Sequence, residues 1–213
     1  MFNIVILTHK PENYRPCVES IIRNEPSINP KQIIVVIDDC EQLDLPVTYI
    51  NGESPFIFSR NANIGIRHAD SDIILLNDDT ELSNRNGFTQ LAQSERSGIT
   101  SAKIIGPCTV KRDMCAFVCV FIPKETQQSI GLLDERFVKY GYEDDDYCRR
   151  VVQAKQPINR CDRCVVNHYH PSRSTFHGEN NLYQGDNLVA FDRKWGIKRT
   201  YTWPEHLEQI KNP

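Results

Sequence analysis

Short apolar runs alternate with segments of helical spacing in the first part of the chain. Four apolar or β-branched runs predict strands, and they cover residues 3–7, 33–37, 47–50 and 72–76. Between them, residues 13–24 and 58–69 carry apolar side chains at helical spacing. The resulting β-α-β-β-α-β order predicts an α/β fold, a Rossmann-like and mostly parallel sheet with helices on both faces.

The second part of the chain is less regular. We expect helices at 87–95, 124–130 and 144–154, and strands near 99–105 and 115–122. From Val165 onward the chain is rich in Asn, His, Ser, Gly and aromatic residues, which is typical of an ordered lid over a site rather than a core layer. Because neither a repeat nor a linker interrupts the pattern, one domain is predicted.

Composition and charge narrow the classes of partner. The 213 residues carry a formal net charge of -3 and no basic run, so nucleic acid is not an expected partner. No apolar stretch reaches the ~18 residues of a membrane span. The first strand begins at once, without the basic and apolar regions of a secretory signal, so a cytoplasmic location is expected.

The eight cysteines are expected to be free thiols, because a cytosolic domain of this size rarely uses disulfides. Cys161 and Cys164 nevertheless have the spacing of half a zinc site. Cys148, His168 and His170 are the residues that would complete it, and structural zinc stays open as the alternative.

Polar clusters follow three of the predicted strands, at residues 8–10, 38–39 and 77–79. Ligands of open α/β sheets bind at the carboxyl ends of the strands, so these clusters predict one site, although Asp and Asn also start turns. No G-x-G-x-x-G and no G-x-x-x-x-G-K-[ST] follows the first strand. Phosphates bound here would need another partner, such as a divalent cation held by carboxylates.

Eight segments, in order along the chain, are similar to family 2 glycosyltransferases, which have the GT-A (nucleotide-diphospho-sugar transferase) fold. They are residues 4–10, 34–39, 59–65, 74–82, 130–137, 141–150, 165–175 and 194–196. The resemblance implies a nucleotide-sugar-binding half at 1–82, and an acceptor-binding half with a C-terminal lid at 83–213.

The resemblance also implies a role for each donor-side residue. Thr8, His9 and Asp38 would hold the nucleotide, with Asp38 accepting a hydrogen bond from the uracil N–H group. Arg60 would help to hold the nucleotide, and Arg173 would reach the diphosphate.

The segment at 77–79 takes the place of the D-x-D motif of the family. Asp79 is the expected carboxylate ligand of Mn²⁺ (or Mg²⁺), and Asp78 would lie nearer the donor sugar. Asn77 replaces the first acid, as in a rhamnosyltransferase-like subset that reads Asn-x-Asp-Thr. Either His168 or His170 would add an imidazole ligand.

Glu143 and Asp144 match the acidic pair on the acceptor side. The resemblance implies that Asp144 is the general base of an inverting transfer and that Glu143 holds the acceptor. The competing interpretation is a run of four acids that is favoured by the helix dipole and simply solvated.

The sequence thus predicts metal-assisted, inverting transfer of a hexose or deoxyhexose, glucose- or rhamnose-like, from a UDP-sugar to a glycan or glycoprotein hydroxyl. The resemblance extends to enzymes that build the capsid glycans of algal viruses, which implies a growing glycan as acceptor. Two alternatives stay open, a sugar-phosphate nucleotidyltransferase and an inactive carbohydrate-binding scaffold. The missing glycine-rich turn argues against the first, and the acids at 79, 143 and 144 argue against the second.

Overall fold

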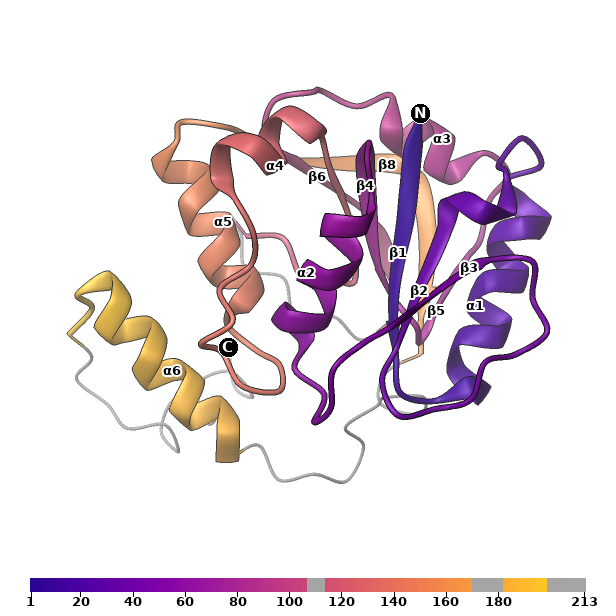
Figure 1. Cartoon of the computed structure of the whole chain (residues 1–213). Helices are drawn as coiled ribbons and strands as arrows, with labels where there is room; N and C mark the ends of the chain where they lie inside the picture. Colours follow the sequence, from indigo (N-terminus) through magenta and orange to yellow (C-terminus); the bar gives the residue numbers. More distant parts are fainter. Residues whose placement is uncertain (107–113, 170–181, 199–213) are drawn as a thin grey trace.

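A computed structural model describes residues 1–106, 114–169 and 182–198 of the chain (Figure 1). Its strands form one eight-stranded sheet in the order β3-β2-β1-β4-β7-β6-β8-β5. The strands are β1 Phe2–Thr8, β2 Ile33–Ile37, β3 Thr48–Asn51, β4 Asp72–Asn77, β5 Thr80–Leu82, β6 Ile99–Ile105, β7 Cys119–Ile122 and β8 Ile158–His168.

Six α-helices and one short 3₁₀ turn at Pro30–Gln32 accompany the sheet in the described part. The helices are α1 Pro11–Asn24, α2 Phe58–His68, α3 Gly87–Ala92, α4 Lys124–Ile130, α5 Glu143–Gln153 and α6 Leu182–Trp195. None of these helices combines the length and the apolar character needed to cross a bilayer.

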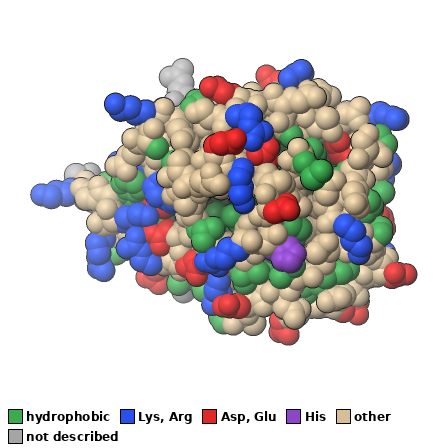
Figure 2. All heavy atoms as spheres, turned by 45° about the horizontal axis from the view of Figure 1, so that its top comes forward, with side chains coloured by type: hydrophobic (Ala, Val, Ile, Leu, Met, Phe, Trp, Pro, Cys, Tyr) green, Lys and Arg blue, Asp and Glu red, His purple; other side chains and the backbone are tan. Residues whose placement is uncertain are grey.

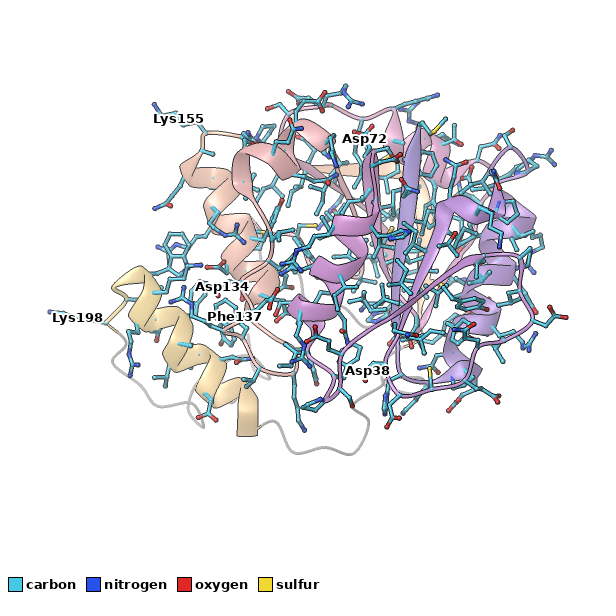
Figure 3. The ribbon with its side chains drawn as sticks, in the orientation of Figure 1. Asp38, Asp72, Asp134, Phe137, Lys155 and Lys198 are labelled. Carbon is cyan, nitrogen blue, oxygen red and sulfur yellow. The ribbon has the colours of Figure 1, made fainter. Side chains whose placement is uncertain are left out.

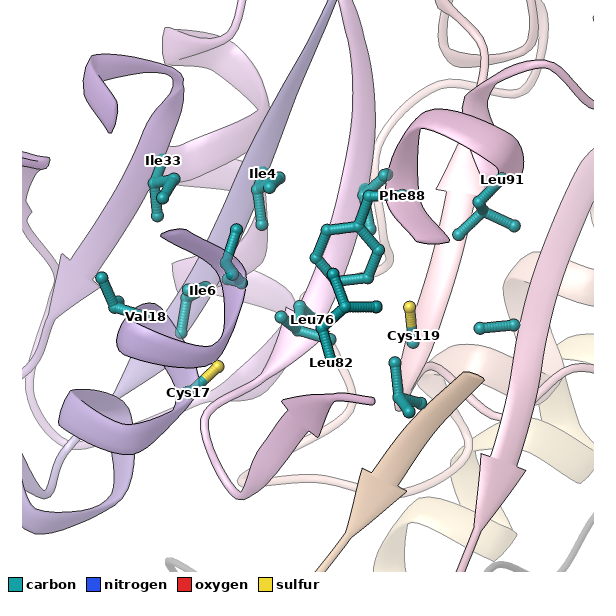
Figure 4. Packing of buried hydrophobic residues seen from close by; sticks show 14 of the residues in the cluster. Ile4, Ile6, Cys17, Val18, Ile33, Leu76, Leu82, Phe88, Leu91 and Cys119 are labelled. Atoms are coloured by element: carbon teal, nitrogen blue, oxygen red, sulfur yellow. The ribbon is translucent and has the colours of Figure 1, made fainter. Parts of the chain in front are cut away.

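The first four strands form the parallel part of the sheet, as predicted. β1 pairs in parallel with both β2 and β4, and β2 pairs in parallel with β3. Alternate side chains of β1 enter different cores because successive residues of a strand face opposite sides. Ile4 and Ile6 pack with α1 and α3 (Figure 4), whereas Val5 and Leu7 pack with α2 and α5. The prediction of an α/β sheet with helices on both faces is therefore confirmed.

The second part of the chain extends the same sheet. β7 pairs antiparallel with β4 and with β6, and β8 then lies parallel to β6. The prediction that the chain becomes a lid from Val165 onward is wrong for the first residues of that stretch. They belong to β8, and Val166 is fully buried, because β6 on one side and β5 on the other satisfy its backbone.

The face in Figure 2 carries Lys and Arg side chains interspersed with Asp and Glu side chains. That view turns the upper end of Figure 1 forward, which is the end where β1 begins. The polar clusters after the strands lie at the other end, because β1 runs downward in Figure 1 and β2 and β4 run parallel to it.

Candidate functional site

The carboxyl ends of β1, β2 and β4 bring four predicted donor-side residues together. Thr8 Oγ1 donates to Asp78 Oδ2 at 2.8 Å, and the backbone N–H of Asp38 donates to the Thr8 carbonyl at 3.0 Å. His9 Nδ1 lies 2.7 Å from the Asp38 carbonyl oxygen and donates to it. These residues lie close together because β1 pairs in parallel with both β2 and β4, so the three strands end side by side.

Asp38, at the carboxyl end of β2, has one carboxylate oxygen that accepts no hydrogen bond (Figure 3). Its side chain is buried, and Oδ1 has no hydrogen bond. Oδ2 lies 3.4 Å from Asn61 Nδ2, and Asn61 Oδ1 in turn accepts from the Glu53 N–H at 2.8 Å. Asn61 was not among the predicted site residues, although it lies inside the resembling segment at 59–65.

Arg60 is engaged by the loop before α2. Its guanidinium donates to the carbonyls of Glu53 and Pro55, and its Nε lies 3.3 Å from the Glu53 carboxylate. Its role in holding a nucleotide stays a prediction.

Asp78 is buried beside a second carboxylate. Burial first, and the charge of Asp79 second, raise the pKa of Asp78 to about 8, against hydrogen bonds from Thr8 and Asn13 that lower it. Burial beside a like charge favours the protonated carboxyl, and a nearby cation would reverse that preference. Asn13, on α1, is a contact that sequence patterning did not reveal.

Asp79 and His168 meet because β5 pairs antiparallel with β8, which places Thr80 opposite His168. Asp79 Oδ1 lies 3.4 Å from His168 Nε2, and the Tyr169 N–H donates to the Asp79 carbonyl at 2.9 Å. Asp79 Oδ1 and Asn77 Oδ1 are both buried without a hydrogen bond. A carboxylate beside an imidazole can supply two ligands to a divalent metal ion such as Mn²⁺.

The described residues supply only part of such a ligand set. Within them, no three His, Cys, Asp or Glu side chains gather as a metal cluster. His170 and Arg173 lie outside the described residues.

The zinc alternative gains no support where the chain is described. Cys161 and Cys164 are buried on β8 as free thiols. Cys148, one residue that would complete the site, lies instead against Cys115, whose N–H is 3.3 Å from Cys148 Sγ.

Glu143 and Asp144 begin helix α5. Glu143 is buried, its Oε2 has no hydrogen bond, and burial first, then the charge of Asp144, raises its pKa well above the usual value. Asp144 is partly exposed and accepts from the Asp145 N–H at 2.8 Å. Asp146 is fully buried. The interpretation of a simply solvated acidic run is therefore wrong for Glu143 and Asp146.

A chain of contacts connects the acidic pair to the end of β4. The Asn77 N–H donates to the Val118 carbonyl at 3.0 Å, and the neighbouring Phe117 ring lies 5.5 Å from that of Tyr147, one turn into α5. In Figure 3, Lys155 follows α5 at the opposite end of the molecule from Asp38. Helix α5 therefore begins at the edge of the sheet that carries the donor-side residues.

No protein-family model and no curated protein matches the sequence. Solved structures do match. GalNAc-T7 with UDP, GalNAc and Mn²⁺ superposes with a TM-score of 0.73 at 15% identity, over 91% of this chain and 47% of that chain. The Pyrobaculum calidifontis mannosyltransferase PcManGT with GDP-Man and Mn²⁺ gives 0.65 at 12% identity, over 99% and 68%. The chain has the GT-A fold.

A third GT-A structure, S. aureus TarS 1–349, matches with a TM-score of 0.57 at 12% identity, over 99% of this chain and 78% of that chain. The chain spans about half the length of GalNAc-T7. Such identities establish a shared fold, so the activity must be argued from the chemistry of the site.

Proposed function

We propose that this GT-A domain is an inverting glycosyltransferase that moves a hexose or deoxyhexose from a UDP-sugar to a glycan hydroxyl. The observation that supports the proposal is that two acidic groups lie toward the same end of the sheet. Asp79 follows β4, and its Oδ1 lies 3.4 Å from Nε2 of His168 on β8. Glu143 and Asp144 begin α5, whose other end leads to Lys155, away from Asp38 (Figure 3).

The donor side has the chemistry for a nucleoside diphosphate. The Oδ1 atom of Asp38, which has no hydrogen bond, suits the N–H of a uracil ring, and Thr8 and His9 both hydrogen-bond to the backbone of Asp38. Arg60 and Arg173 are proposed to approach the diphosphate. Asp79 would hold Mn²⁺ (or Mg²⁺), with His168 or His170 as an imidazole ligand, and Asn77 would contact the donor. When bound, the cation stabilises the charge that grows on the leaving diphosphate.

The acceptor side has the chemistry for proton transfer. Asp144 is partly exposed and would take the proton of the acceptor hydroxyl as that oxygen attacks the anomeric carbon from the face opposite the diphosphate. Glu143, whose pKa is raised by burial and then by the charge of Asp144, would hold another hydroxyl of the acceptor. Attack from the opposite face inverts the configuration.

The sugar and the acceptor are assigned more coarsely. A glucose- or rhamnose-like donor is proposed because the Asn77-Asp78-Asp79 segment resembles that of a rhamnosyltransferase-like subset, and Asp78 would lie close to the sugar. A growing glycan or glycoprotein, such as the capsid glycans of algal viruses, is the proposed acceptor.

A screen of donor hydrolysis across UDP-, GDP- and dTDP-sugars tests the proposal, together with calorimetric titration of UDP with and without Mn²⁺. We expect metal-dependent UDP binding, hydrolysis of a UDP-sugar, and loss of both in Asp79→Asn. Turnover of a nucleoside triphosphate with a sugar phosphate would favour nucleotidyl transfer instead. No nucleotide binding at all would favour the inactive scaffold.

A further inference from the structure

The turn before the acidic pair has an unusual backbone. Lys139, Gly141 and Tyr142 all have positive φ, at 52°, 103° and 72°. Side chains with a Cβ rarely adopt this region, and Tyr142 is bulky, so the turn needs contacts from outside to keep its shape. Because Glu143 follows directly, the turn sets where the acidic pair points.

One buried side chain from α6 supplies these contacts. Asn187 Oδ1 accepts from the Val138 N–H at 2.9 Å. Its Nδ2 donates to the carbonyls of Val138, Tyr140 and Gly141 at 2.9, 3.2 and 2.9 Å. The amide group therefore closes both ends of the turn with all its donors and its acceptor in use.

Helix α6 is itself fixed against the acceptor half. Lys194 Nζ lies 2.7 Å from Asp134 and 2.6 Å from Asp146, and Trp195 Nε1 donates to Asp146 Oδ1 at 3.0 Å. The Phe191 ring lies 5.4 Å from the ring of Tyr142. Asn187, which we call the clamp on the turn, therefore lies on a helix that is itself held in place by ion pairs and ring contacts.

We propose that Asn187 is a positioning residue for sugar transfer, which holds the turn at 138–142 so that Glu143 and Asp144 face the acceptor. The inference rests on the proposed function. It predicts that Asn187 affects the chemical step without affecting donor binding, because Asn187 contacts none of Thr8, Asp38 or Asp79 in the described hydrogen-bond network.

The test compares Asn187→Ala with two α6 controls. Val189→Ala changes an exposed neighbour. Leu188→Ala removes apolar packing from the cluster that also contains Tyr142, but leaves the hydrogen bonds of Asn187 in place. Two readouts are taken on the full chain, steady-state kinetics with the best UDP-sugar and backbone hydrogen exchange with mass spectrometry. The dissociation constant of UDP with Mn²⁺ is measured beside them.

In Asn187→Ala we expect kcat to fall by ~10- to 100-fold, because a small misplacement of reacting groups has that effect. UDP binding should stay within about a factor of two, and exchange should rise over 138–146 but not in β1 or β4. Leu188→Ala should lower the melting temperature about as much as Asn187→Ala does, but it should keep most of kcat.

Two results would overturn the inference. One is an unchanged kcat in Asn187→Ala, and the other is a loss of kcat in Leu188→Ala as large as in Asn187→Ala. If the wild-type chain transfers no sugar while Asn187→Ala still frees the turn, the proposed function fails and the role in transfer fails with it. The clamp would then be purely structural.

Discussion

The donor-side residues at the carboxyl ends of the strands and the turn at 138–142 on the acceptor side are positioned in different ways. Thr8, Asp38 and Asp78 follow strands that are neighbours in one parallel ladder, so the pairing of β1 alone brings them together. The acidic pair at 143–144 follows a left-handed turn that is held by Asn187 from a helix much later in the chain. Strand topology places the first group, and a network of side chains places the second.

Asp144→Asn gives the largest expected effect and separates the two regions by function. Transfer should fall by ~10²–10⁴-fold, the usual contribution of a general base. UDP binding should stay intact, because the donor side is built by other strands. Steady-state kinetics and calorimetry on one preparation would check both, and a parallel loss of UDP binding would break the separation.

Asp146→Ala tests how strongly the acceptor side depends on buried charge. This fully buried carboxylate meets Lys194, Arg150 and the Trp195 N–H group. Removing one partner of a buried ion pair leaves the others uncompensated, so we expect a loss of ~3–5 kcal/mol in unfolding free energy. Chemical denaturation measures it.

The control for Asp146→Ala is Glu19→Ala. Glu19 forms an exposed pair with Arg15 at 3.7 Å, and such a pair contributes at most about 1 kcal/mol. Equal losses in both variants would contradict the distinction between buried and exposed charge.

Gly65→Ala tests the packing of the donor half. A Cβ at this position would lie 2.4 Å from Val5 Cγ1 and 3.1 Å from Val36 Cγ2, so α2 would have to move away from β1 and β2. Overpacking of this kind destabilises by ~1–3 kcal/mol. Thermal unfolding would show it, with the exposed His68→Ala on the same helix as the unaffected reference.

The smallest expected effect is on the pH dependence of stability, compared between the wild type and Glu143→Gln. The folded-state pKa of Glu143 is raised above 4.5, so its contribution to stability is complete below that pH and is lost as the pH rises toward the folded value. As the pH rises, the unfolding free energy of the metal-free wild type should therefore fall relative to that of Glu143→Gln, by up to about 1.4 kcal/mol per pH unit. Urea unfolding at about pH 5, 6 and 7 gives the two profiles. Parallel profiles would show that Glu143 is ionised in the folded protein.

Sequence patterning predicted the donor half well, because buried parallel strands are continuous apolar runs and their polar ends share one edge. It failed at β8, where Asp162, Arg163 and Asn167 interrupt the apolar pattern and the pairing with β6 shifts register between Ala102 and Lys103. It also missed α6, whose interior contains Gly185. The roles of Asn61 and Asn187 depend on partners distant in sequence, which a local pattern does not contain.

The decisive measurement is paramagnetic broadening of backbone amide signals by Mn²⁺ in the presence of UDP. If the acids at 79 and 144 border one sugar nucleotide, the amides of both residues should broaden together at low Mn²⁺, while Lys155 at the far end of α5 stays sharp (Figure 3). Broadening at Asp79 with a sharp signal at Asp144 would contradict a shared site.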